Sequence, residues 1–253
     1  MRILLLSIFT IITVVFNTIP SFAESPAPKY ALGIGLDVSS GTYGSRTIST
    51  YVTAPLIVDW FPNDRLDLEL TIPLLYQRTS STGRGGGGVL GGDYGLGDIT
   101  LTSGYSLLRD SPATPHLRPT LYLKFPTAAE SKEFSTGELD FGAGLAVSKW
   151  FGNWQPFTEV RYVVQGGSHA VSGAENFLTV DTGIAFSMNE HLMTSMYARF
   201  GSPPFNDMSA PLEVRLKTVW RFAERTYTEV YALRGLSNGS PDFGVGATVF
   251  FEF

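Results

Sequence analysis

The chain contains no cysteine, which excludes disulfide bonds, thiol catalysis and metal sites built on cysteine. Charged residues make up only 16% of its 253 residues, whereas a soluble domain usually carries about 25%. Basic residues are few and scattered, and the formal net charge is −5, so nothing favours a nucleic-acid partner. Beyond residue 23, no apolar run is long enough for a membrane-spanning helix. These absences argue against an ordinary cytosolic enzyme and against a bundle of membrane helices.

The first 23 residues have the pattern of a secretory signal peptide. Arg2 provides a positive charge, residues 3–16 form an apolar run, and Ser21-Phe22-Ala23 offers the small residues that a signal peptidase needs. The run is shorter than a spanning helix requires, which disfavours an uncleaved anchor. We therefore predict cleavage after Ala23 and a single mature domain over residues 24–253.

The mature sequence alternates between apolar and polar residues with the period of β-strands. In residues 65–77, for example, Leu66, Leu68 and Leu70 point to one side while Asp67 and Glu69 point to the other. The pattern predicts an all-β fold of twelve strands. Their ranges are 30–38, 47–60, 65–77, 95–108, 117–126, 138–150, 155–165, 176–187, 191–200, 211–222, 227–236 and 242–253.

Strand length and loop length separate a membrane barrel from a soluble sandwich. Most of these strands have about ten residues or more, as a tilted membrane span needs, whereas strands of soluble proteins are typically nearer five or six. Short links at 61–64, 152–154, 188–190 and 223–225 alternate with long polar links at 78–94, 127–137, 166–175 and 201–210. Short periplasmic turns and longer outer loops are typical of bacterial outer-membrane barrels.

The tryptophans support the same interpretation, because all four lie near predicted short turns. Amphipathic rings prefer the boundary between headgroups and hydrocarbon. We therefore predict a closed antiparallel transmembrane β-barrel in the outer membrane, with an even number of strands so that both ends of the chain lie in the periplasm. Its periplasmic aromatic girdle is expected to contain Trp60, Trp150, Trp154, Trp220 and Phe253.

If the apolar residues face lipid, the opposite set lines the interior. This set is nearly balanced in charge, so its members either form structural ion pairs or line a path for a solute. Arg221 and Glu229 are a plausible pair across a short turn. Inward glycines on the first, sixth and last strands allow curvature or leave room for a loop or ligand. The predicted lumen-lining residues are Asp67, Glu69, Asp98, Arg118, Lys124, Asp140, Glu159, Arg161, Asp181, Arg199, Glu213, Arg215, Lys217, Arg221 and Glu229.

Two segments resemble a known outer-membrane family. Tyr94-Gly95-Leu96-Gly97-Asp98-Ile99-Thr100-Leu101 resembles a strand of the family named for the MetA pathway of phenol degradation. Residues 121–127, followed by Leu139-Asp140-Phe141-Gly142, are similar to its next hairpin. The resemblance is strongest over residues 94–165 and implies a transporter of small, often hydrophobic compounds. It assigns no catalytic or binding residue to this chain.

The leading hypothesis is a barrel that passes or binds a small molecule without chemistry or a cofactor. Its expected partners are outer-membrane lipid, an unidentified solute and the barrel-assembly machinery, which would recognise the last strand ending at Phe253. One alternative is a lipid-modifying barrel enzyme, for which Ser168 and His169 are the only candidates, although adjacent loop residues do not face one another. A second alternative is a structural barrel whose interior is filled by side chains.

Overall fold

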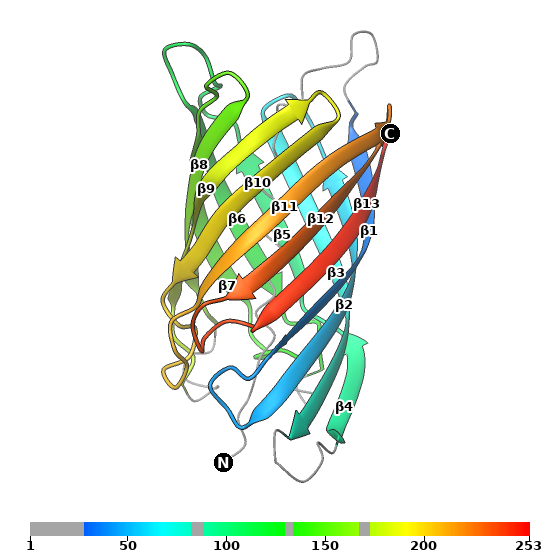
Figure 1. The fold of residues 1–253 in the computed structure, drawn as a ribbon, viewed down its shortest axis with the longest axis vertical. Coiled ribbons are helices and arrows are strands. Elements are labelled where there is room, and N and C mark those ends of the chain that lie inside the picture. Colours follow the sequence, from blue (N-terminus) through cyan, green and yellow to red (C-terminus); the bar gives the residue numbers. More distant parts are fainter. Residues whose placement is uncertain (1–27, 82–88, 130–133, 167–172) are drawn as a thin grey trace.

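The computed structural model describes residues 28–253 except 82–88, 130–133 and 167–172. The predicted signal peptide and the Ser168–His169 pair therefore lie outside the described residues. Figure 1 shows a single tilted barrel. Its strands are β1 (Tyr30–Gly41), β2 (Thr47–Trp60), β3 (Leu66–Ser81), β4 (Val89–Leu96), β5 (Ile99–Tyr105), β6 (His116–Phe125), β7 (Asp140–Ser148), β8 (Trp154–Val164), β9 (Phe177–Asn189), β10 (Leu192–Gly201), β11 (Leu212–Ala223), β12 (Thr226–Gly235) and β13 (Phe243–Glu252).

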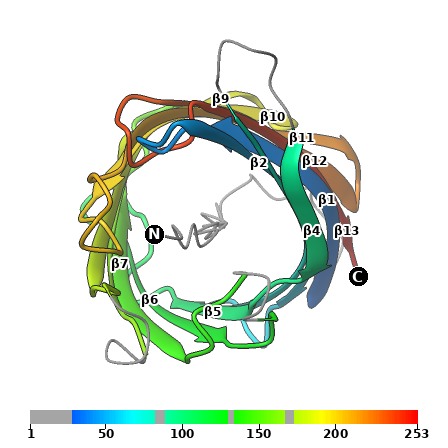
Figure 2. The same cartoon turned by 90° about the horizontal axis from the view of Figure 1, so that it is seen from below.

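The sheet is antiparallel and closes on itself. Consecutive strands pair with each other, except that β5 pairs with β3 in place of β4. Because β1 also pairs with β13, the sheet returns to its starting point. Seen along its axis, the wall forms a continuous ring (Figure 2). Closure leaves no long unpaired edge inside the membrane, where each unsatisfied backbone group would cost several kcal/mol. No helix in the described ranges is long and apolar enough to cross a membrane.

The sequence predicted one strand over 95–108 as the fourth of twelve. The structure has two shorter strands, β4 and β5, in its place. β4 pairs with the half of β3 nearer the long loops, from Leu74 to Ser80. β5 pairs with the half of β3 nearer the short turns, from Leu66 to Thr71. The break falls at Gly97, whose amide donates to the Pro73 carbonyl at 2.8 Å. A Cβ at Gly97 would lie 2.7 Å from the Leu75 side chain and 2.9 Å from the Pro73 ring, so any larger residue here would have to displace these side chains.

The predicted loop over 78–94 was wrong in part. β3 continues to Ser81 and β4 begins at Val89, and Gln77 pairs with Asp93 and Thr79 with Gly91. Figure 1 shows this hairpin projecting beyond the other strands, at the end opposite the C-terminus. Outside the membrane neither face of a hairpin has to be apolar, so its strands lack the alternation that marks the other strands.

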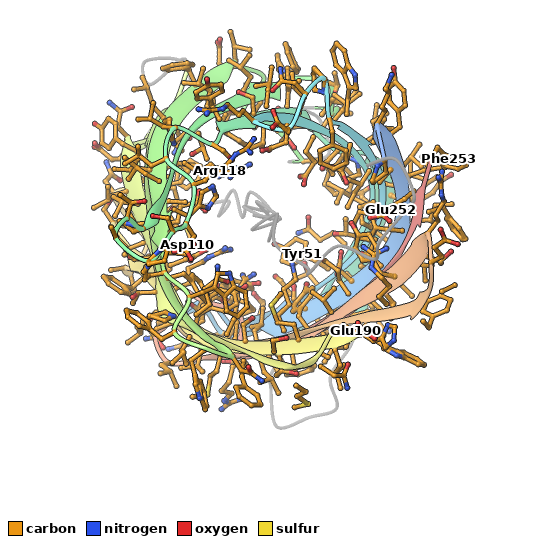
Figure 3. All side chains as sticks on the ribbon, turned by 90° about the horizontal axis from the view of Figure 1, so that it is seen from above. Tyr51, Asp110, Arg118, Glu190, Glu252 and Phe253 are labelled. Carbon is orange, nitrogen blue, oxygen red and sulfur yellow. The ribbon has the colours of Figure 1, made fainter. Side chains whose placement is uncertain are left out.

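The two faces of the wall differ as the alternation predicts. Large apolar side chains are exposed on the outside, including Leu74 (59% exposed) and Met196 (58%). The buried residues are mostly polar and point inward, and Figure 3 shows Tyr51 and Arg118 directed toward the interior while Phe253 lies outside. An apolar exterior around a polar interior is the arrangement of a membrane barrel and the reverse of a soluble protein.

Candidate functional site

Charged side chains on the inner face form rows that run around the barrel. The register places Glu159 of β8, Asp181 of β9, Arg199 of β10 and Glu213 of β11 next to one another. Arg199 binds Asp181 through two hydrogen bonds of 2.7 Å, and its Nε lies 4.0 Å from Glu213. Two parallel bonds from a guanidinium fix both side chains in one geometry. The row therefore holds three neighbouring strands together by ion pairs across the sheet.

Each of the seven predicted basic lumen residues makes an ion pair. Arg118 binds Asp67, with its Nε 3.1 Å from Oδ1. The other pairs are Lys124 with Asp98 and Asp140, Arg161 with Glu159, Arg199 with Asp181, Arg215 with Glu213, Lys217 with Glu229, and Arg221 with Glu252.

Arg221 and Glu229, which were suggested as a pair, bind other residues instead. The two guanidinium nitrogens of Arg221 lie 2.6 and 3.0 Å from the Glu252 carboxylate, and Glu229 accepts from Lys217 at 2.7 Å instead. In the register, Arg221 stands opposite Tyr227 rather than Glu229. The ring of Tyr227 lies 5.3 Å from the Arg221 guanidinium, so this arginine is held by an aromatic ring and a carboxylate.

The structure places every predicted lumen residue on the inner face, to different depths. Ten are buried, and five have intermediate exposure. The buried ones are Asp67, Glu69, Arg118, Asp140, Glu159, Arg161, Asp181, Arg199, Glu213 and Lys217, and those with intermediate exposure are Asp98, Lys124, Arg215, Arg221 and Glu229.

Three carboxylates on the inner face were missing from the predicted set. Asp37 of β1 and Asp59 of β2 are 4% and 3% exposed, and Glu252 of β13 binds Arg221. These strands are adjacent in the wall. With them, acidic residues outnumber basic ones on the inner face, which the sequence had indicated to be nearly balanced.

The inward glycines make space for neighbouring side chains. At Gly33 an added Cβ would lie 2.6 Å from the ring of Phe250, which is fully buried. At Gly246 it would lie 1.8 Å from the Asp37 carboxylate and 2.4 Å from the Tyr231 ring. Glycine at these two positions lets large inner side chains lie across the seam between β1 and β13.

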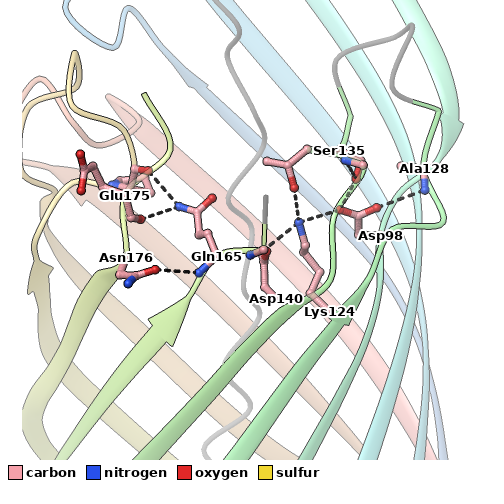
Figure 4. Close-up of polar contacts among 12 residues, drawn as sticks. Asp98, Lys124, Ala128, Ser135, Asp140, Gln165, Glu175 and Asn176 are labelled. Atoms are coloured by element: carbon pink, nitrogen blue, oxygen red, sulfur yellow. Dashed lines mark hydrogen bonds and ion pairs between the residues drawn. The ribbon is translucent and has the colours of Figure 1, made fainter. Parts of the chain in front are cut away.

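At the outer end of the lumen, Lys124 of β6 contacts three parts of the chain (Figure 4). They are the break between β4 and β5, the start of β7, and the connection between β6 and β7. The Lys124 amino group lies 3.2 Å from Asp98, 2.9 Å from Asp140 and 3.0 Å from the Thr136 hydroxyl. Asp98 also accepts from the Ala128 amide at 3.1 Å and the Ser135 hydroxyl at 2.8 Å. We call residues 126–129 and 134–139 the β6–β7 segment. The contacts bind this segment to the break between β4 and β5.

Apolar packing holds the same segment against the wall. Phe134 is 3% exposed and packs with Ala128 and with Leu75 of β3. The β6–β7 segment thus folds inward and narrows the outer end of the lumen. Sequence reasoning assigned it only to a long polar link, because Phe134 carries no periodic signal.

Replacing Lys124 with methionine is expected to loosen the β6–β7 segment. The change leaves Asp98 and Asp140 without their shared cation, and a loss of 1.4 kcal/mol in local stability raises the open population tenfold. Limited proteolysis of the folded protein in detergent should therefore cut this segment roughly tenfold faster. Lys149→Met is the matched control, because Lys149 binds Asp110 at the opposite end. Equal cleavage rates in the two variants would contradict this role.

A larger apolar cluster lies on the inner face nearer the short turns. It contains Phe157, Ala185, Met193, Tyr197 and Val219, with the Phe157 and Tyr197 rings 5.8 Å apart. Trp150, which was predicted for the periplasmic girdle, packs against this cluster. Its indole is therefore directed toward the interior, because strand β7 ends at Ser148 and the alternation does not extend to residue 150.

The remaining girdle residues are exposed at the end where the turns are short. Trp60, Trp154, Trp220 and Phe253 are 45%, 50%, 52% and 62% exposed. Trp154 lies 4.4 Å from the Phe186 ring, and Trp220 lies 5.5 Å from the Phe222 ring. The first contact joins the adjacent strands β8 and β9, and the second lies within β11. Exposed rings at such a rim are typical of interfacial aromatic residues.

In the turn between β2 and β3, Asp64 binds Arg109 from the turn between β5 and β6. The hydrogen bond from the guanidinium, together with its charge, lowers the pKa of the Asp64 carboxyl. The described residues contain no group of three or more histidine, cysteine, aspartate or glutamate side chains arranged to hold a metal ion.

The closed wall, apolar exterior and charged interior define an outer-membrane β-barrel. Solved structures of similar architecture show the fold. An outer membrane channel from Pseudomonas putida F1 is 18% identical, has a TM-score of 0.66, and matches over 91% of this chain and 97% of its own. The translocator domain of the autotransporter NalP from Neisseria meningitidis is 12% identical, with a TM-score of 0.51 and coverage of 91% and 90%. The KdgM porin is 7% identical, with a TM-score of 0.51 and coverage of 88% and 99%.

A family model identifies the chain more narrowly. Residues 25–253 match the model described as MetA-pathway of phenol degradation. The chain belongs to this family, which confirms the resemblance seen in residues 94–165. The search of curated proteins gave no match.

Proposed function

We propose that the protein is an outer-membrane channel that lets small molecules cross the membrane without covalent chemistry. The observation that carries this proposal is the reversed distribution of polarity, with ion-paired rows inside and apolar side chains outside. A wall of this kind is stable in hydrocarbon and presents charged groups to a water-filled interior. The similarity to an outer membrane channel and to a porin supports it.

The predicted lumen-lining residues would then form the walls of the solute path. Their ion pairs hold the charges in fixed positions, so the wall would be rigid and its field permanent. The inward-folded β6–β7 segment would make the outer end the narrowest part that the described residues define. Solutes would therefore be selected by size at the outer end and by charge deeper in the lumen.

The route to the membrane is part of the same proposal. Cleavage after Ala23 would release the mature barrel in the periplasm. The barrel-assembly machinery would then recognise β13, whose outward residues Phe243, Val245 and Phe251 are about half exposed and which is followed by Phe253. N-terminal sequencing of the mature protein from outer membranes should begin at Glu24, and a sequence that retains residues 1–23 would contradict cleavage.

Conductance of the purified protein in a planar bilayer tests the channel. Discrete, long-lived current steps are expected when the folded barrel inserts, and detergent buffer without protein should give none. A barrel whose folding is verified by its resistance to dissociation in detergent, yet which remains silent in the bilayer and passes no solute in a liposome-swelling assay, would instead support the structural barrel.

A further inference from the structure

Ion pairing on the inner face leaves acidic residues in excess along one side of the lumen. Seven basic side chains are paired with eight carboxylates, those of Asp67, Asp98, Asp140, Glu159, Asp181, Glu213, Glu229 and Glu252. The inner carboxylates outside these pairs include Asp37 and Asp59. They lie on β1 and β2, which are neighbours in the barrel.

Asp59 stands directly opposite Glu69 in the register between β2 and β3. Both side chains are buried, and the Oδ1 atom of Asp59 has no hydrogen-bond partner. Glu69 accepts a bond from the Thr71 hydroxyl at 3.3 Å. Lys217, whose charge acts on Asp59, makes its ion pair with Glu229 instead. Among the described residues, no ion pair involves Asp59.

Asp37 repeats this situation on the next strand. Its carboxylate lies over Gly246 of β13 and hydrogen-bonds the Tyr231 side chain. Its Oδ2 atom has no hydrogen-bond partner, although the residue is only 4% exposed. The charge of Arg215 acts on Asp37, but Arg215 makes its ion pair with Glu213. A buried carboxylate without an ion-pair partner is costly in its ionised form, so ionised Asp37 attracts any cation that can approach it.

We propose that Asp37 and Asp59 make this lumen select for cationic solutes. The inference rests on the proposed channel function and adds the class of solute to it. The basic side chains of the inner face are each neutralised locally, so their field falls off quickly. Asp37 and Asp59 make no ion pair, so in their ionised form their electric field is not cancelled locally. A low-dielectric wall focuses such a field into the lumen. Cations are therefore concentrated along β1 and β2, and anions are depleted.

The reversal potential under a KCl gradient across a planar bilayer tests this proposal. It is measured at about pH 9, because burial disfavours the ionised form of a carboxyl and both side chains must be ionised. The wild-type channel is expected to pass K⁺ in preference to Cl⁻ by about threefold or more. The double variant Asp37→Asn, Asp59→Asn keeps the side-chain shapes and removes both charges, so the preference should fall by about twofold or more. Single-channel conductance close to the wild-type value identifies a correctly folded variant.

The matched control is Glu190→Gln, Glu224→Gln, which removes two charges from exposed periplasmic turns. Salt screens exposed charges within about 10 Å at 0.1 M, so this variant should keep the wild-type reversal potential. A conducting channel without cation preference overturns the inference and leaves the channel function intact. A preference that survives in the Asp37 and Asp59 variant also overturns it. A silent wild-type barrel contradicts the channel itself.

Discussion

Replacing Leu216 with arginine is expected to destabilise the folded barrel in a lipid bilayer by about 2–4 kcal/mol, because the charge must sit near the membrane midplane. Leu216 lies in the middle of β11 and is 50% exposed on the outer face. The free energy of unfolding, measured by denaturant titration of the protein in vesicles, gives the change. In a soluble protein, arginine at an exposed position would cost almost nothing.

Phe222→Arg is the matched control for this prediction. Phe222 lies on the same face of the same strand, is 49% exposed, and is next to the periplasmic turn. An arginine there can reach the headgroups, so the expected cost is about 0–1 kcal/mol. Equal costs at the two positions, or no cost at Leu216, would mean that this face does not contact hydrocarbon.

Replacing Arg199 with methionine is expected to lower the free energy of unfolding by about 3–5 kcal/mol. The Asp181 side chain is only 1% exposed. Its two carboxylate oxygens each accept a hydrogen bond from the Arg199 guanidinium. Without the guanidinium, the buried Asp181 carboxylate loses its ion-pair partner on the inner wall. The same denaturant titration measures the loss.

A second variant separates loss of the pair from loss of arginine packing. Arg199→Met combined with Asp181→Leu removes both charges, and replacing both members of a buried pair is often nearly neutral. The double variant should therefore recover most of the stability that the single variant loses. If it is as unstable as the single variant, the ion pair is not the source of the effect.

The fold could be predicted because the membrane imposes a strong rule on outward residues. In 65–77 every second residue is apolar, since Leu66 through Tyr76 must face hydrocarbon, and the range matches β3 up to its extension. The extension and β4 were missed, because residues such as Arg78 and Gly92 lie beyond the membrane and obey no such rule. The break at Gly97 was missed because alternation does not report which strand pairs with which.

The inner face was harder to predict for a related reason. Residues of the inner face contact one another rather than lipid, so a strand can carry apolar residues on that face as well. On β2, Tyr51, Pro55 and Ile57 point inward beside Asp59, and the usual contrast between the two faces is lost. The pairing of Arg221 with Glu252 depends on the register of β11, β12 and β13 together, which alternation within one strand cannot specify.

The pairing of β1 with β13 has a consequence for biogenesis. These strands come from opposite ends of the described chain, yet ten residue pairs join them, from Ala31 with Glu252 to Ser40 with Phe243. The barrel cannot close until β13 has been synthesised, and a chain that ends before β13 keeps two unpaired sheet edges. Closure must therefore follow synthesis of β13, and the chain cannot complete its barrel before that point.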